Sequence, residues 1–347
     1  MGAATLEFGL DTFGDVTDDA AGRPTPQPQV IREVVAEAVL ADRLGLDVFG
    51  VGEHHRADLA ISSPEMVLAA AAGRTGRIRL ASSVTVLSSD DPVRVFQRFS
   101  TLDAVSDGRA ELIVGRGSFT ESFPLFGLPL DQYEALFEEK LALLAALRRE
   151  ARVSWQGRLR APLHDQAVFP RTARPLPTRV AVGGSPESVV RAARHGLPVV
   201  LAIIGGDPAR FRPYGELFTR ALAEFGQGPL PLAVHSPGHV AASDEEARAR
   251  FWPHYRAMHD RIGAGRGWPP FSREAYLHEI ERGSLYVGSP ETVARKIART
   301  VRLLGIARFQ LKYSAGSLPH ALMLDCIERY AGEVRPRVQA LLDEAMG

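Results

Sequence analysis

Apolar residues along the chain fall into two alternating patterns. The first consists of short runs rich in Val, Ile and Leu, which are typical of buried strands. Eight runs are predicted as strands: Leu6 to Leu10, Asp47 to Val51, Ile78 to Leu87, Ala110 to Val114, Arg179 to Val182, Pro198 to Ile204, Leu230 to Val240, and Phe309 to Lys312. Eight is the number of strands that closes a parallel barrel.

The second pattern consists of longer segments with apolar residues at three- and four-residue spacing, which predicts amphipathic helices between the strands. The predicted helices are Val30 to Leu44, Pro64 to Ala72, Pro92 to Val105, Gln132 to Arg149, Pro186 to Arg194, Pro208 to Phe225, Pro290 to Leu304 and Pro319 to Met346. Several begin with proline, which suits the first helical turn. We therefore predict an α/β protein, a (β/α)8 TIM barrel that forms a single domain over residues 1–347.

Two segments are too long for a minimal barrel. They are Val153 to Pro177, after the fourth predicted strand, and Asp260 to Leu285, after the seventh. Since loops that follow barrel strands carry the active site, both are predicted as insertions at the mouth of the barrel.

Composition and charge narrow the functional classes. Apolar residues make up 45% of the chain, and 41 basic residues balance 41 acidic ones. This balance is unlike the basic surface of a nucleic-acid-binding protein and gives no support for membrane binding. No apolar run is long enough to span a membrane, and the N-terminus carries no secretory signal pattern. The single cysteine, Cys326, is predicted to be buried, and we expect a cytoplasmic protein.

Two histidines follow the second predicted strand, in the sequence Gly52-Glu53-His54-His55. Barrels place catalytic groups at this end of a strand, and adjacent side chains on an extended chain point to opposite sides, so one histidine is expected to face the mouth. The alternative is that both make loop hydrogen bonds only. No metal site is predicted, because His235 and His239 flank Pro237 and Gly238 and cannot share one helix face.

Two glycine-containing turns are candidates for binding a phosphate. Arg116 stands between Gly115 and Gly117 after the fourth strand, and Gly183 to Ser185 lead into a helix that begins at Pro186. Glycines allow close approach of the backbone, and a helix N-terminus attracts anions. The alternatives are a surface salt bridge for Arg116 and an ordinary helix cap for Ser185.

These motifs, in this order, resemble the luciferase-like flavin-dependent monooxygenases and oxidoreductases. The resemblance also rests on the segments Arg77 to Val84, Asp91 to Arg94, Leu102 to Arg109, and Val287 to Val293. It covers nearly the whole chain. It implies a (β/α)8 barrel that binds FMN, usually as reduced flavin that reacts with oxygen to oxidise a small organic substrate.

Site residues are carried over from the resemblance position by position. His54 matches the catalytic histidine near the reactive flavin edge, where an ordinary pKa near 6.5 would suit proton exchange. Ser83 and Val84 match the place where the family carries a non-prolyl cis peptide under the flavin. The implied cofactor-binding residues are His55, Ser83, Val84, Arg116, Gly117, Ser118, Gly183, Gly184, Ser185 and Ser188.

The resemblance also implies a mobile lid, a partner and an assembly state. The 260–285 segment matches the lid over the flavin, with Gly263, Gly265 and Gly267 as hinges and with Trp268 and Phe271 covering the substrate. A separate flavin reductase would supply reduced FMN, and a homodimer would form through the alanine-rich helix that contains Met66.

Competing functions stay open at this point. A deazaflavin- or NAD(P)H-dependent oxidoreductase could use the same barrel, and so could a flavin-binding protein without turnover. A metal-dependent hydrolase lacks the expected inward set of carboxylates and histidines. Phe119, Phe123, Phe126 and Trp268, together with several arginines, fit an apolar or mildly anionic substrate.

Overall fold

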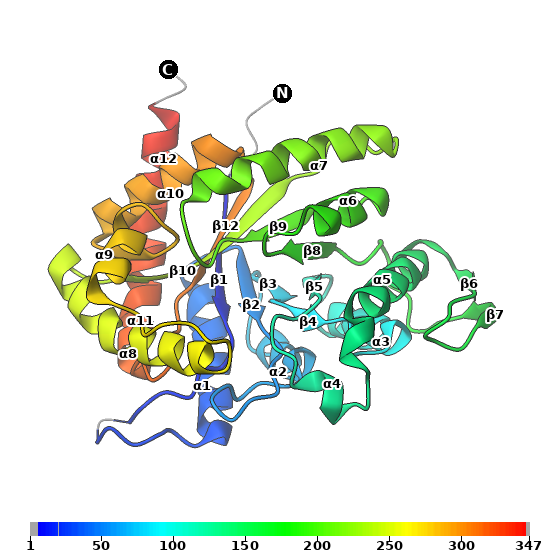
Figure 1. Cartoon of the computed structure of the whole chain (residues 1–347), viewed down its shortest axis with the longest axis horizontal. Coiled ribbons are helices and arrows are strands. Elements are labelled where there is room, and N and C mark those ends of the chain that lie inside the picture. The colour runs from blue at the N-terminus through cyan, green and yellow to red at the C-terminus, as the bar shows by residue number, and fades with distance from the viewer. Residues whose placement is uncertain (1–5, 20, 345–347) are drawn as a thin grey trace.

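A computed structural model describes residues 6–19 and 21–344. Within them, eight parallel strands close into a barrel, because β1 pairs with both β2 and β12, and β9 pairs with both β8 and β10 (Figure 1). The strands are β1 (Glu7–Thr12), β2 (Val48–Val51), β3 (Arg79–Ser82), β5 (Ala110–Gly115), β8 (Thr178–Val182), β9 (Val199–Ala202), β10 (Leu232–Val240) and β12 (Arg308–Lys312). The predicted barrel is confirmed.

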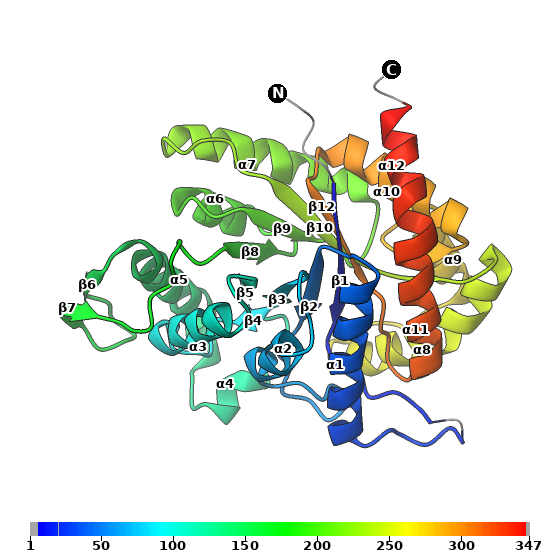
Figure 2. The ribbon, with the colours of Figure 1, turned by 180° about the vertical axis from the view of Figure 1, so that it is seen from behind.

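Helices surround the barrel, and Figure 2 shows the α11 and α12 pair beside α1, which completes the ring. The helices are α1 (Gln27–Arg43), α2 (Pro64–Ala72), α3 (Pro92–Val105), α4 (Ser122–Leu125), α5 (Tyr133–Arg149), α6 (Pro186–Arg194), α7 (Arg212–Glu224), α8 (Asp244–Ala264), α9 (Arg273–Glu281), α10 (Pro290–Leu304), α11 (His320–Arg329) and α12 (Arg335–Asp343). In the described part of the chain, no helix combines the length and the apolar character needed to cross a membrane.

Three predicted elements are divided in the structure. The predicted strand 78–87 is interrupted at a cis Ser83–Val84 peptide, after which β4 (Thr85–Val86) pairs with β5. The predicted helix 208–225 begins with a 3₁₀ turn, and the last one passes through a π-helical turn at Tyr330–Val334. Its predicted end, Met346, lies outside the described residues. Cys326 is buried, as predicted.

The segment 153–177 does not form a loop at the mouth. It follows α5, and it contains an antiparallel hairpin of β6 (Arg152–Trp155) and β7 (Leu163–Ala167) that leads from this helix to β8. Val153 is buried, whereas most of β7 is exposed. Because β7 has so few buried side chains, its sequence does not carry the alternation that marks a strand.

The prediction of a loop over 260–285 is also wrong in part. Helix α8 continues to Ala264, α9 spans Arg273–Glu281, and a short strand, β11 (Tyr286–Gly288), pairs with the end of β10. Only 265–272 is an irregular loop between the two helices. The helices were missed because this segment is rich in Gly, Arg and Pro and α8 contains Pro253, so its helical pattern is weak.

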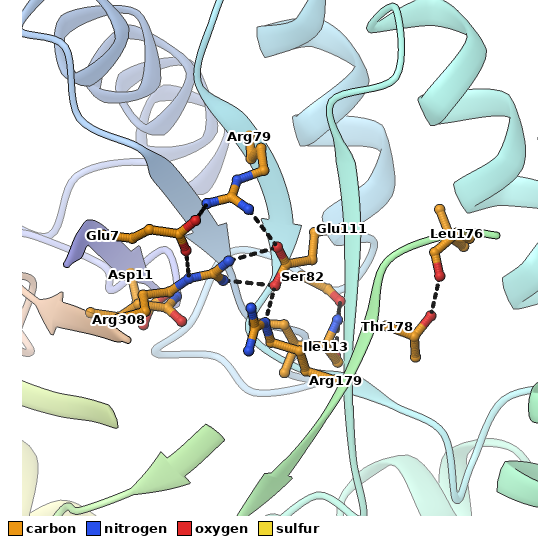
Figure 3. Close-up of polar contacts among 11 residues, drawn as sticks. Glu7, Asp11, Arg79, Ser82, Glu111, Ile113, Leu176, Thr178, Arg179 and Arg308 are labelled. Atoms are coloured by element: carbon orange, nitrogen blue, oxygen red, sulfur yellow. Dashed lines mark hydrogen bonds and ion pairs between the residues drawn. The ribbon is translucent and has the colours of Figure 1, made fainter. Parts of the chain in front are cut away.

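Side chains that point into the barrel form layers, as alternation along each strand requires. The layer at the N-terminal ends of the strands is ionic. Glu111 of β5 accepts hydrogen bonds from Arg308 at 2.7 and 2.9 Å and from Arg179 at 2.8 Å, and Arg308 also binds Glu7 (Figure 3). Glu111 and Arg308 are both buried, so this network closes the end of the barrel opposite the mouth.

The next layers change from apolar to polar toward the mouth. The middle layer contains a compact apolar cluster of Val48, Ala81, Ile113, Val200 and Ala233. The layer above it is again polar, with side chains from β1, β10 and β12 that the following section describes. The barrel is therefore a filled core with charges at both ends.

The ionic layer predicts a large loss of stability in Glu111→Gln. Removing this carboxylate leaves Arg308 and Arg179 buried without their main counter-charge, which costs about 3–5 kcal/mol and is measured by chemical unfolding. Glu291→Gln is the matched control, since Glu291 pairs with Arg295 on an exposed helix face, and it should cost less than about 1 kcal/mol. Equal losses in the two variants would contradict the role of the buried network.

The same layer predicts a dependence of stability on pH. Burial alone would raise the pKa of Glu111, but Arg308, Arg179 and Arg79 lower it to about 2 from an ordinary value of 4.5. A folded-state pKa below the unfolded value gives stability that is present above pH 4.5 and is lost as the pH falls toward 2. The stability difference between the wild type and Glu111→Gln should therefore shrink over this range. A constant difference would contradict the prediction.

Candidate active site

Loops that follow the barrel strands enclose an open cavity of about 620 Å³ at the mouth of the barrel. Its walls come from the loops after β1, β2, β5 and β12 and from α8. The lining residues are Val16, Asp18, Pro24, His55, Arg56, Ala57, Asp58, Glu121, Arg261 and Ser317. Charges of both signs line this cavity, and Arg56 binds both Asp58 and Glu121. A polar ligand would find hydrogen-bonding partners here.

A cluster of charged side chains joins the end of β5 to the start of α6, and we call it the phosphate corner. Arg116 forms an ion pair with Glu134, and Glu134 also binds Arg191, which lies 3.4 Å from the hydroxyl of Ser188. The pKa of Glu187, at the start of α6, is lowered mainly by a backbone hydrogen bond. The positive charge of Arg116 lowers this pKa further, which places Arg116 near the start of α6. The two predicted phosphate-binding turns are thus brought together, and Arg191 is an additional cation there.

The backbone of the phosphate corner fits a phosphate group. Ser185 caps α6 by accepting a hydrogen bond from the Ser188 N–H. Among the described residues, the N–H groups of Gly184 and Ser185 have no acceptor. Gly184 has a φ of +117°, and a side chain at Gly183 would meet open space. Free amides at a helix N-terminus beside an arginine are the donors that a phosphate requires, so the residues present fit the phosphate of FMN.

His54 lies between two aromatic rings at the mouth. Its ring centroid is 4.5 Å from that of Phe13 and 5.3 Å from that of Phe119, and its Nδ1 is buried without a hydrogen-bond partner among the described residues. Burial lowers the pKa of His54 to about 3. The expectation of an ordinary pKa is therefore wrong: apolar rings disfavour the charged form, and His54 is neutral at physiological pH.

His55 makes other contacts than His54, packs on Phe126 and belongs to the lining of the cavity. Its Nε2 lies 2.9 Å from Glu53, whose other carboxylate oxygen accepts a hydrogen bond from the Val86 N–H at 2.8 Å. Glu53 thereby connects His55 to the segment that contains the cis Ser83–Val84 peptide. The side chain of Val84 packs against Gly115, where any Cβ would lie 2.9 Å from it.

A buried ion pair that the sequence analysis did not identify lies next to His54. Lys312 of β12 binds Asp15 at 2.9 Å, and Asp15 also accepts hydrogen bonds from Ser314 and from the Gly316 N–H. Burial would raise the pKa of Asp15, but Lys312 and these hydrogen bonds lower it below its ordinary value. The Lys312 ammonium lies 4.6 Å from the ring centroid of Phe13, so the pair borders the same aromatic wall as His54.

The 265–272 loop reaches across to the loop after β5. Arg266 donates a hydrogen bond of 2.7 Å to the Ser118 carbonyl, and its guanidinium lies over the rings of Phe119 and Trp268. Trp268 is 43% exposed. Phe271 packs on His259 instead, with ring centroids 4.3 Å apart.

Of the three predicted hinge glycines, only Gly267 has a positive φ, at +70°. Gly263 lies within α8, and Gly265 caps the same helix with an ordinary helical φ. The hinge role of these glycines stays a prediction. The predicted site residues form two groups: Arg116 with the start of α6, and His54 with the cis Ser83–Val84 segment.

The sequence analysis did not predict several residues at the mouth of the barrel, because they lie within or just after apolar strands or in loops without a motif. Asp15 follows β1, and Asp11 within β1 faces the interior of the barrel. An acidic residue at position 11, within an apolar run, was the signal in the sequence that could have indicated buried polar groups here. Arg56, Asp58 and Glu121 lie in loops without a motif, and only the fold brings them together.

A profile of the luciferase-like monooxygenase family matches residues 12–308. N-acetyl-S-alkylcysteine monooxygenase of Bacillus subtilis is 28% identical over 287 residues, which are 78% of this chain and 82% of that protein.

Two solved structures share the fold. The oxygenating constituent of 3,6-diketocamphane monooxygenase from Pseudomonas putida, in complex with FMN, has a TM-score of 0.76 at 21% identity over 96% of this chain and 99% of that one. An F420-dependent secondary alcohol dehydrogenase has a TM-score of 0.73 at 17% identity, with the same coverage of 96% and 99%. The family match spans most of the chain, and the closed parallel barrel agrees with it: this protein belongs to the luciferase-like monooxygenase family.

Proposed function

We propose that this protein is an FMN-dependent monooxygenase that uses reduced flavin and oxygen to oxidise a small organic substrate. The observation that carries the proposal is the phosphate corner, where Arg116, the Ser188 hydroxyl and the free amides of Gly184 and Ser185 lie at one helix N-terminus. Several of its relatives are named as oxidoreductases, and among them the N-acetyl-S-alkylcysteine enzyme is named a monooxygenase.

In this proposal, some residues of the site would bind the cofactor and others would take part in the reaction. FMN, when bound, would supply the electrons that activate oxygen. Arg116 and the α6 amides would hold its phosphate, together with Gly117, Ser118 and Gly183 in the flanking turns. The Ser83–Val84 segment, supported by Glu53 and His55, would border its ring. His54, being neutral, would donate or accept a hydrogen bond at the flavin ring without placing a charge there.

A second candidate is an F420-dependent oxidoreductase. The observation in its favour is the structural likeness to the F420-dependent secondary alcohol dehydrogenase. This enzyme would transfer a hydride and would not need to activate oxygen.

The mouth cavity indicates the character of the substrate. Its lining carries Asp18, Asp58 and Glu121 as well as Arg56 and Arg261. A polar substrate that forms hydrogen bonds with both acidic and basic side chains fits this lining better than the apolar substrate suggested by the phenylalanines.

The proposal also includes a flavin reductase as partner and a homodimer through α2, on which Met66 is 68% exposed.

The phosphate corner predicts weaker FMN binding in Arg116→Ala. Losing a hydrogen bond to a charged phosphate costs about 1.5–3 kcal/mol, which corresponds to an increase in Kd of roughly ten- to 150-fold. Fluorescence titration of the wild type and the variant with FMN measures the change. The fold should persist, because Glu134 keeps Arg191 as a partner.

Arg295→Ala is the matched control, since Arg295 pairs only on the exposed face of α10, and it should leave the Kd unchanged. Unchanged FMN affinity in Arg116→Ala would remove the phosphate from this corner. Binding of F420 but not of FMN by the wild type would favour the second candidate.

The contact between the 265–272 loop and Ser118 predicts a role in coupling. In Arg266→Ala the loop loses its hydrogen bond to Ser118 and its contact with Phe119, so water enters the mouth more easily. We expect the protein loaded with reduced FMN to release hydrogen peroxide faster than the wild type. Arg256→Ala, on the exposed side of α8, is the control, and equal peroxide release in both variants would argue against a lid.

A further inference from the structure

A histidine and a carboxylate form a close pair on the inner wall of the barrel. Nδ1 of His235, on β10, lies 2.6 Å from Oδ2 of Asp11, on β1. The other oxygen of Asp11 accepts a hydrogen bond of 2.8 Å from Gln310, on β12. Strand β12 lies between β1 and β10, and all three side chains are buried in the polar layer that faces the mouth.

The surroundings hold Asp11 in one position. Gly50 stands opposite it on β2, and a Cβ there would lie 1.9 Å from Oδ1 of Asp11, so only glycine leaves room for the carboxylate. A carboxylate accepts hydrogen bonds and does not donate them, so Nδ1 of His235 carries the hydrogen. Its Nε2 is then the acceptor nitrogen. Among the described residues Nε2 has no hydrogen-bond partner, and it does not belong to the buried unpartnered atoms.

His235 belongs to the same wall as His54. The ring of Phe13 stacks on His235, with centroids 5.9 Å apart and an interplanar angle of 14°, and it also contacts His54. This places two imidazoles on one phenylalanine, but only His235 has a carboxylate partner. Burial lowers the pKa of His54 to about 3, so His54 does not carry a proton at neutral pH.

Among the described residues, no lysine or arginine forms an ion pair with Asp11. The ionisable groups around Phe13 are Asp11 and Asp15 from β1 and its loop, Lys312 from β12, His54 from the loop after β2, and His235 from β10. Lys312 is committed to Asp15. A protonated His235 would balance Asp11, and an oriented imidazole with a paired carboxylate is the usual arrangement of a proton-transferring histidine.

We infer that His235, oriented by Asp11, is the residue that exchanges a proton with the molecule oxidised at the mouth. The inference rests on the proposed function and deepens it, because it names a substrate class: compounds with an O–H or N–H group next to the atom that is oxidised. The Nε2 lone pair takes the proton, and the electron pair of the broken O–H or N–H bond stays on the substrate. The imidazolium is balanced by Asp11 and later returns the proton to water through Nε2.

Nitrogen NMR of the histidine rings in the full chain tests the pair directly. Signals absent from His235→Gln identify His235, and we expect them to show hydrogen on Nδ1 and none on Nε2 in the neutral ring. Asp11→Asn should reverse this tautomer. Gln310 donates a hydrogen bond to Oδ1 of residue 11, so the new asparagine will keep its amide oxygen at that position. Its NH₂ group will then face Nδ1 of His235. Nδ1 must accept this hydrogen bond, and the ring hydrogen therefore moves to Nε2. Hydrogen on Nε2 in the wild type would overturn the inference.

The functional role is tested by oxygen consumption of the protein loaded with reduced FMN, measured over roughly pH 5 to 8 with a phenol and its O-methyl ether as probes. We expect phenol-dependent consumption to fall on the order of a hundredfold in His235→Gln and to lose its dependence on pH, while the ether gives no stimulation. His239→Gln is the matched control, since His239 is buried on the same strand and stacks on Phe251 without an ionic partner among the described residues.

The possible outcomes separate the inference from the proposed function. A pH profile in His235→Gln like that of the wild type, equal losses in both histidine variants, or equal stimulation by phenol and ether would overturn the inference. Absence of any phenol stimulation in the wild type would overturn the substrate class. Failure to bind FMN would instead overturn the proposed function, and it would leave the NMR result on the Asp11–His235 pair standing.

Discussion

The register in which β1 pairs with β12, and β12 with β10, determines which polar side chains lie together inside the barrel. Asp11 lies opposite Lys312, and His235 lies opposite Gln310, two residues earlier on β12, so all four side chains face inward near one another. A slip of β1 by one residue would turn Asp11 toward the helices and bring Leu10 into the mouth. The closed barrel resists such a slip because β1 is also paired with β2. The polar layer is therefore a consequence of sheet closure, not of any local motif.

The two charged ends of the barrel interior differ in how completely their groups are paired. In the layer that contains Glu111 and Arg308, both oxygens of the carboxylate accept hydrogen bonds from guanidinium groups. At the mouth, Nδ1 of His54 and Nε2 of His235 have no partner among the described residues. Breaking a buried ion pair destabilises the fold, whereas nitrogen atoms without a partner in a shielded site can take part in a reaction. The ion pairs that stabilise the barrel thus lie at one end of its interior, and the groups available for a reaction lie at the other. Small apolar side chains fill the layer between them.

The sequence predicted the barrel well because its strands and helices carry strong periodic patterns, and proline or glycine marks many of their ends. The cis Ser83–Val84 peptide was predicted through the resemblance, since it does not follow from periodicity. The meeting of Arg116 with the start of α6 was predicted from the two glycine-containing turns, because both follow strands that end at the mouth. The pairs Asp11–His235 and Asp15–Lys312 escaped prediction because their partners are 224 and 297 residues apart. The shifted pKa of His54 escaped it for a related reason: Phe13 and Phe119 surround that ring only in the folded chain.

The phosphate corner and the mouth have different parts in selecting the cofactor. In the proposed site, Arg116 and the α6 amides would bind a negative charge, and FMN and F420 both carry a phosphate, so this corner would accept either one. Discrimination must come from the ring, which would lie nearer Phe13, His54 and the Ser83–Val84 segment. A neutral His54 between two phenylalanines gives the reacting edge an apolar, water-poor border, with the charges of Asp15 and Lys312 cancelled behind Phe13. Oxygen activation benefits from such a border, because water that reaches the reduced cofactor promotes unproductive decay. The aromatic wall is in this way one of the grounds for the monooxygenase that we propose.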